Sequence, residues 1–273
     1  GLFLVFKGLS KKVLIADLLA TLAVDNVFTH PLTFSSWDLL IGLYAYTFQI
    51  YYDFSGYSDI AIGLAKMLGY DLPQNFNRPY LSQNVREFWT RWHISLSTWL
   101  RDYLYISLGG SRVAPWRVKM NLMITMFLGG LWHGAALHFI CWGVYHGLLL
   151  ILARQGPKTE AVRTAAQKVL LQIGCFHLIA FGWLLFRVQD LDNFLDFIRG
   201  WSHLTGGTRL SGVFYIILSL GILFHIFPAQ RLERFAQWWI MRPVPIQAAT
   251  YGTLLLIYAG MTLEAPSFIY FQF

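Results

Sequence analysis

The chain has 273 residues, of which 56% are hydrophobic and only 13% are charged. Soluble domains carry about 25% charged residues, so this sequence has too few charges to cover a water-facing surface of its size. The formal charge of +7 comes from basic residues beside apolar segments, which is typical of cytoplasmic membrane loops, and we expect no nucleic-acid binding.

Apolar segments predict an all-α, multi-pass transmembrane helical bundle. A span needs about 20 apolar residues to cross the hydrocarbon core. The segments near that length are 13–28, 37–52, 135–153, 166–188, 210–228 and 246–264, and two weaker ones are 54–69, which three glycines interrupt, and 119–132, which is too short. We expect one membrane domain over 1–273. Because the sequence begins inside an apolar stretch, we expect it to be the C-terminal part of a longer chain.

Charge in the connecting segments predicts the orientation of the bundle. Segments 73–119, 154–168 and 229–245 are rich in Lys and Arg, whereas 189–209 contains three aspartates and two arginines. The positive-inside rule therefore places the three basic segments in the cytoplasm and the acidic one outside.

Residues 86–105 differ from the spans. Large apolar side chains recur there at helical spacing, and Arg86 and Arg101 lie on another face. Such a basic amphipathic helix is expected to lie in the membrane plane. The alternative is a helix packed beneath the bundle on its soluble side.

The sharpest candidate for chemistry is His133, in the sequence GGLWHGA at 129–135. Its glycines are expected to interrupt the apolar stretch between two helices, and irregular backbone at membrane depth needs protein or a water-filled cavity around it. An imidazole at such a break can take a proton from a hydroxyl group, because its ordinary pKa lies near neutrality. The alternative is a histidine that only anchors the turn.

Three further histidines lie in apolar segments. His177 is central in 166–188, where it predicts a second base, a group that binds a carbonyl, or an interhelical hydrogen bond. His138 and His146 lie two helical turns apart on the next predicted helix after His133. No nearby carboxylate or metal-binding spacing accompanies them, so we expect no metal, and a supporting role is the most that His146 would have.

Two acids stand out in YYDFSGYSDI, the segment 51–60. Asp53 and Asp59 are expected either to line a polar channel or to cap the ends of short helices. Neither GxSxG nor GxxxxGK[ST] occurs, so the sequence offers neither a nucleophile elbow nor an ATP-binding loop.

Several segments together resemble the membrane-bound O-acyltransferase superfamily, in the bacterial branch that acylates alginate and teichoic acid. The longest, 49–110, runs from QIYYDFSGYSDI to YLYISLGG. The others are FKGLSKKVLIADLLA (6–20), GGLWHGA (129–135), WGVYHG (142–147) and HLIAFGWLLFR (177–187).

This resemblance implies a bundle with broken or re-entrant helices around a central tunnel. His133 matches the histidine of the family's WHG motif, and His177 matches a later histidine of the D-alanyl branch. Either is then expected to act as the base, while Trp132 is one of several candidates to stabilise the developing oxyanion, with His146 and Asp53 in supporting roles. No bound cofactor is expected. The resemblance implies an acyl-CoA or acyl-carrier thioester as donor.

The resemblance also implies a place and partners. We expect a multi-pass protein of the bacterial cytoplasmic (inner) membrane, in contact with lipid. Its arginines Arg86, Arg91 and Arg101 are expected to bind the phosphates of the donor, or else anionic lipid headgroups. The acceptor is expected to be an extracytoplasmic polysaccharide, reached directly or through a periplasmic acetyltransferase. The alternatives are D-alanyl transfer to teichoic acid and a subunit that transports polysaccharide without catalysis.

Overall fold

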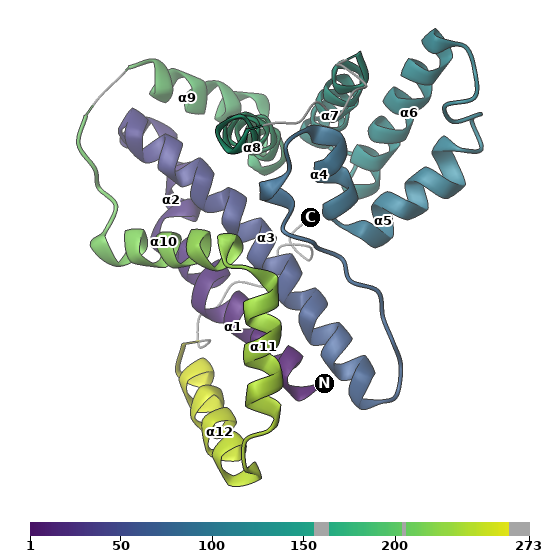
Figure 1. The fold of residues 1–273 in the computed structure, drawn as a ribbon. Coiled ribbons are helices and arrows are strands. Elements are labelled where there is room, and N and C mark those ends of the chain that lie inside the picture. The colour runs from purple at the N-terminus through teal and green to yellow at the C-terminus, as the bar shows by residue number, and fades with distance from the viewer. Residues whose placement is uncertain (156–163, 204–205, 262–273) are drawn as a thin grey trace. The chain divides into compact units, whose positions relative to one another are not determined.

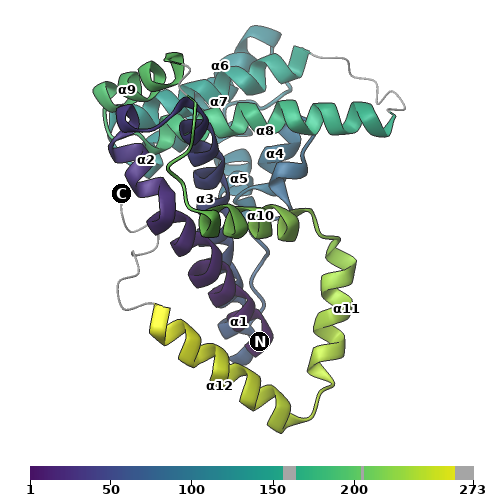
Figure 2. The ribbon, with the colours of Figure 1, turned by 90° about the vertical axis from the view of Figure 1, so that its left-hand side faces the viewer.

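The computed structural model describes residues 1–155, 164–203 and 206–261, and the regular secondary structure within them is helical throughout (Figures 1 and 2). This confirms the predicted all-α class. The chain forms two compact units, one of residues 1–26, 44–74 and 208 onward, the other of 27–43 and 75–207. The single membrane domain expected over 1–273 stays a prediction.

The first unit is built from helices at both ends of the chain and most of the long helix α3. Their bounds are α1 Leu2–Lys11, η1 Lys12–Asp17, η2 Ala20–Val24, α3 Ser36–Met67, α10 Gly212–Ile226, α11 Ala229–Ile240 and α12 Val244–Met261. The short helix α2, Asp25–Thr29, begins in this unit and has most of its residues in the other. Two of these, η1 and η2, have wider π-helical turns. Phe6 of α1 stacks on Tyr251 of α12 with ring centroids 4.2 Å apart, which joins the two ends of the unit.

The predicted segments 37–52 and 54–69 are not separate, because α3 runs unbroken through Gly56 and Gly63. These glycines do not interrupt the helix, and they allow another segment of backbone to pack closely against it. A Cβ on Gly56 would lie 2.8 Å from the carbonyl oxygen of Gly8, and one on Gly63 would lie 2.8 Å from that of Gly1. A glycine in a helix costs about 1 kcal/mol relative to alanine, and here it lets two backbones approach.

Asp53 lies in the middle of α3 and is 3% exposed. Its carboxylate is 2.6 Å from Nζ of Lys12, which also lies 2.8 Å from the carboxylate of Asp17. Asp59, also inside α3, pairs with Lys7 and Lys11. The expectation that these two acids cap short helices is therefore wrong, because both lie far from a helix end.

Among the residues that the structure describes, three helices are long and apolar enough to cross a bilayer, in the windows Leu137–Arg154, Ala165–Arg187 and Val244–Met261. A fourth span arises if α10 and α11 count as one, bent by 94° between them (Figure 2). The bend bears out the predicted broken helices. It follows Pro228, which cannot supply the backbone N–H that would continue the ladder of α10.

The second unit contains the predicted motifs. Its bounds are η3 Pro31–Thr33, η4 Pro79–Leu81, α4 Val85–Arg91, α5 Ile94–Trp99, η5 Leu100–Tyr105, α6 Pro115–His133, α7 Leu137–Gln155, α8 Ala165–Arg187 and α9 Leu191–Ser202. Helices α6, α7 and α8 lie beside one another in chain order (Figures 1 and 2). A Cβ on Gly130 would collide with the carbonyl oxygen of Phe139, so glycine sets the close approach of α6 and α7.

The predicted helix over 86–105 is broken, contrary to expectation. Trp92 is extended and His93 has a left-handed backbone, with φ of 41°. A distant segment holds the break open, because Asn77 N–H donates to the Arg91 carbonyl and Ile94 N–H donates to the Asn75 carbonyl. Periodicity alone does not reveal a break that depends on residues about 16 positions away.

Candidate active site

His133 is the last residue of α6, and the chain leaves helical geometry at Gly134. The interruption predicted for 129–135 is therefore shorter than expected, since Gly129 and Gly130 remain helical. A Cβ on Gly134 would lie 2.8 Å from the ring of Phe139. The final glycine of the motif thus lets the turn fold against the start of α7.

The imidazole of His133 is half-buried among aromatic rings. The rings of Trp142 from α7 and Phe186 from α8 meet it edge-on, with centroids 5.3 Å and 5.0 Å away. Trp132 also contacts it, at 5.0 Å. Three helices therefore fix the position of one titratable side chain, which is the preorganisation that a catalytic group needs.

Trp132 is 56% exposed and lies between two histidines. Its ring centroid is 5.0 Å from that of His133 and 6.2 Å from that of His93. Burial lowers the pKa of His93 to about 4, so this imidazole is neutral near pH 7. The predicted supporting residue Trp132 is thus in direct contact with the predicted base.

His146 is fully buried on α7, and neither ring nitrogen has a hydrogen-bond partner among the described residues. Trp142 lies 5.0 Å away and Trp89 of α4 lies 5.2 Å away, measured between ring centroids. Trp142 therefore contacts both His146 and His133. The structure brings these two predicted site residues together through one indole ring.

The indole N–H groups of Trp89, Trp142 and Trp183 are also buried without a hydrogen-bond partner in the described part of the chain. Trp183 of α8 lies 6.0 Å from Trp142 and 6.5 Å from His146. We call Trp89, Trp142, His146 and Trp183 the indole–imidazole cluster. Buried polar groups in folded proteins are nearly always paired, so four unpaired side chains in one place are unusual.

His177 lies elsewhere on α8. It is exposed, and its Nδ1 lies 2.8 Å from the carbonyl oxygen of Ile173 in the same helix. Phe186, which contacts His133, is nine residues further on, or about 13 Å along the helix axis. The two predicted bases are therefore at different levels of the unit, and the catalytic role of His177 stays a prediction.

The predicted donor-binding arginines differ in their surroundings. Arg86 is exposed on α4. Arg91 forms a 2.6 Å ion pair with Glu87, and Arg101 forms a 2.7 Å ion pair with Asp102 on the exposed surface. Arg86 is thus the arginine whose side chain is best placed to meet a ligand from solution.

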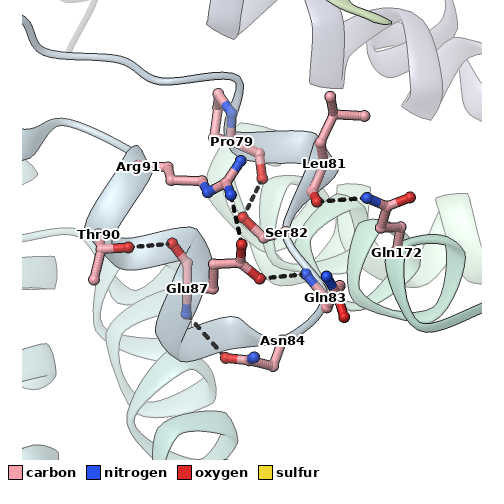
Figure 3. A network of polar contacts seen from close by, with 9 residues as sticks. All are labelled: Pro79, Leu81, Ser82, Gln83, Asn84, Glu87, Thr90, Arg91 and Gln172. Carbon is pink, nitrogen blue, oxygen red and sulfur yellow. Dashed lines mark hydrogen bonds and ion pairs between the residues drawn. The ribbon is translucent and has the colours of Figure 1, made fainter. Parts of the chain in front are cut away.

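A polar network anchors α4 against α8 (Figure 3). The Asn84 side chain accepts a hydrogen bond from Glu87 N–H, and the Glu87 carboxylate accepts one from Gln83 N–H. Gln172 of α8 donates to the carbonyl of Leu81, just before α4. These contacts fix α4 and therefore the position of Trp89.

Two further histidine or carboxylate residues considered from the sequence, Asp53 and His138, lie outside the indole–imidazole cluster. Asp53, predicted to support the site, belongs to the other unit, where it is paired with Lys12. His138 is half-buried at the start of α7. No group of three or more potential metal ligands occurs among residues 1–155, 164–203 and 206–261.

The sequence analysis did not single out Trp89, Trp142, Trp183 or Phe186. Trp142 and His146 are four residues apart, so they share a helix face, and Trp183 and Phe186 are three apart. This helical spacing of aromatic residues near a histidine was the signal in the sequence that could have indicated them. It could not show which helices would face one another.

The fold and the site define a helical membrane protein in which aromatic rings surround a buried histidine, His146, and a half-buried one, His133. The model of the MBOAT, membrane-bound O-acyltransferase family matches residues 1–189, and the chain belongs to this family. This confirms the resemblance found in the sequence.

Curated relatives agree. The chain is 51% identical over 188 residues to a probable alginate O-acetylase of Azotobacter vinelandii. The aligned part makes up 68% of this chain and 36% of that protein. It is 41% identical over 207 residues to a peptidoglycan O-acetyltransferase of Helicobacter pylori, covering 76% and 39%. It is 29% identical over 205 residues to a teichoic acid D-alanyltransferase of Bacillus subtilis, covering 68% and 50%. The chain thus spans about a third of the length of the alginate relatives.

Proposed function

We propose that this chain is part of an O-acyltransferase of the bacterial cytoplasmic membrane. It would move an acetyl group from a cytoplasmic thioester toward hydroxyl groups of an extracytoplasmic polysaccharide. The observation that carries this proposal is the position of His133, half-buried at a helix end and contacted by rings from α7 and α8.

The proposed chemistry uses His133 as the base. Its imidazole takes the proton of the acceptor hydroxyl while the hydroxyl oxygen attacks the thioester carbonyl carbon. The carbon–sulfur bond then breaks, and the imidazolium returns the proton to the leaving thiolate. General base catalysis of this kind contributes typically about 10²–10⁴-fold.

We propose that the transferred group is acetyl, because the O-acetylating relatives are more similar to this chain than the D-alanylating ones. The O-acetylating relatives are 41–51% identical to this chain, whereas the D-alanylating ones are 29–36% identical. His177, which matches a histidine of the D-alanyl branch, is exposed in this structure and lies apart from His133 along α8. The class of acceptor that we propose is an alginate-like polysaccharide, because the relatives that are 48–51% identical to this chain are probable alginate O-acetylases.

The donor would be acetyl-CoA or an acetylated carrier protein, whose phosphates would meet the exposed side chain of Arg86 on α4. Arginine suits this role because its planar guanidinium forms paired hydrogen bonds to phosphate oxygens. A periplasmic acetyltransferase would be the natural partner if the acetyl group leaves the membrane protein before it reaches the polysaccharide.

A complementation experiment tests the proposal. The gene is deleted in the source bacterium, and the released polysaccharide is analysed by mass spectrometry after restoring either the wild-type gene or the His133→Gln variant. We expect the deletion to remove O-acetyl groups without reducing polysaccharide yield, and only the wild-type gene to restore them. A fall in yield with unchanged acetyl content per sugar would favour the transport alternative instead.

A further inference from the structure

The indole–imidazole cluster has a marked imbalance of hydrogen-bonding groups. Trp89, Trp142 and Trp183 each contribute one N–H donor and no acceptor. A neutral His146 adds one donor and one acceptor, so the cluster offers four donors and a single acceptor. Leaving a buried donor unpaired costs the desolvation of that group, so such a set points to a ligand that accepts hydrogen bonds.

The excess of donors over acceptors excludes ligands that bring hydrogen-bond donors of their own. A water molecule or a sugar hydroxyl brings donors of its own, and the cluster has only one acceptor to receive them. A carbonyl oxygen accepts and does not donate. The walls are also aromatic, since Phe88 and Trp142 face the ring of His146, and they suit a small acyl group better than a hydrated sugar.

The position of the cluster matches this chemistry. Trp89 comes from α4, the helix that also carries Arg86. Trp142 contacts Trp89 on one side, at 5.8 Å, and His133 on the other, at 5.3 Å. The cluster therefore lies between the helix proposed to receive the donor and the proposed base.

We propose that the carbonyl oxygen of the acyl thioester binds in this cluster and accepts hydrogen bonds from two of its donors, which are the indole N–H groups of Trp89, Trp142 and Trp183 and the imidazole N–H of His146. This inference rests on the proposed function, because it takes the ligand to be the thioester donor. Donors placed at a carbonyl oxygen also stabilise the negative charge that grows there during attack.

Vibrational spectroscopy tests the site without relying on turnover. The probe is S-acetyl-4′-phosphopantetheine with ¹³C at the acetyl carbonyl, since this arm is common to coenzyme A and acyl-carrier proteins. It is added to the full-length protein in lipid nanodiscs, in a His133→Gln background that keeps the thioester intact. The carbonyl stretching band is read from the difference between ¹³C- and ¹²C-labelled samples.

Hydrogen bonds to a carbonyl oxygen lower its stretching frequency. We expect the bound probe to absorb at a lower frequency than the free probe, and at least one of the variants Trp142→Phe, Trp183→Phe and His146→Phe to shift the band upward. Trp99→Phe is the matched control, because Trp99 is 54% exposed and lies outside the cluster. An unshifted band in the parent, or the same band in all three variants, would overturn the proposal.

Two further measurements separate this site from simple packing. With His133 intact, each variant that shifts the band is expected to lose at least 10-fold in kcat/KM for the probe, with Trp99→Phe unchanged. Without probe, the Phe variants should still fold and melt in one cooperative transition, because the packing lost with the smaller ring is partly offset by removal of an unpaired buried polar group. A lower melting temperature with an unchanged band would assign the cluster to packing or a bound water, and would overturn the proposal.

The outcomes also separate the site from the proposed function. If the wild-type protein transfers no acetyl group but the band shifts as expected, the carbonyl site stands and the transferase function fails. If the wild-type protein transfers acetyl groups and no cluster variant changes the rate or the band, the function stands and the carbonyl site fails.

Discussion

The imidazole of His146 lies against the backbone of Gly182, so closely that a methyl group on Gly182 would be 2.6 Å from Nε2. The helices α7 and α8 therefore meet at a position where one residue must be glycine and the other is a fully buried histidine. Any side chain at position 182 has to displace the imidazole and, with it, the neighbouring ring of Trp142.

The first prediction concerns this contact. Gly182→Ala should lower both the melting temperature and acyl transfer, because the added methyl group pushes His146 out of the cluster. Gly174→Ala on the same helix is the control, since a Cβ there meets nothing within 4 Å. It should keep full activity and melt at the same or a higher temperature, as alanine favours the helix by about 1 kcal/mol. Equal behaviour of the two variants would show that the contact does not matter.

The second prediction concerns the two candidate bases. His133→Gln should fold and melt normally yet lose about 10²-fold or more of acyl transfer per molecule, because Gln keeps a hydrogen bond but accepts no proton at neutral pH. His177→Gln should retain more activity than His133→Gln, because His177 is exposed and about 13 Å along α8 from Phe186. Acyl transfer is divided by the amount of protein, which is measured by quantitative immunoblot. Near-normal activity of His133→Gln would remove the base from the mechanism.

The third prediction concerns the donor. Arg86→Gln should raise the KM for the thioester more than it lowers kcat, since an arginine that binds phosphate equally in the ground and transition states contributes uniform binding. Arg199→Gln, whose arginine pairs with Asp196 in the acidic segment predicted to lie outside, should leave the KM unchanged. Initial rates over a range of donor concentrations separate the two constants. An unchanged KM in Arg86→Gln would assign Arg86 to lipid contact.

The fourth prediction concerns pH. Burial lowers the pKa of His93 from 6.5 to about 4, so the folded protein favours its neutral form. The stability that depends on neutral His93 is therefore fully present above about pH 6.5 and is lost as the pH falls toward 4. His93→Asn keeps a residue that tolerates the left-handed backbone but cannot titrate, so its melting temperature should fall less over this range. Parallel melting curves for the two proteins would contradict this.

The fifth prediction concerns orientation. In a background without Cys141 and Cys175, a cysteine at Ser202 should react with an impermeant maleimide added to intact cells. A cysteine at Gln230 should react only after the membrane is opened. Both positions are exposed, so access depends on the side of the membrane rather than on burial. Reaction at Gln230 in intact cells would reverse the predicted topology and move the donor to the wrong face.

The sequence by itself determined the helical membrane class, because apolar segments of about 20 residues have only one common solvent, the bilayer. It also located His133, because a histidine next to glycine in an apolar stretch stands out without any tertiary information. Local composition is sufficient for both conclusions.

Only the tertiary structure decided what those local features do. Gly56 looked like an interruption but lies inside a continuous helix, where it allows a backbone from another helix to approach. The break at His93 depends on Asn75 and Asn77, and the exposure of His177 depends on which face of α8 is turned inward. The indole–imidazole cluster combines α4, α7 and α8. These features arise from contacts between residues far apart in the chain, and no periodicity within one segment records them.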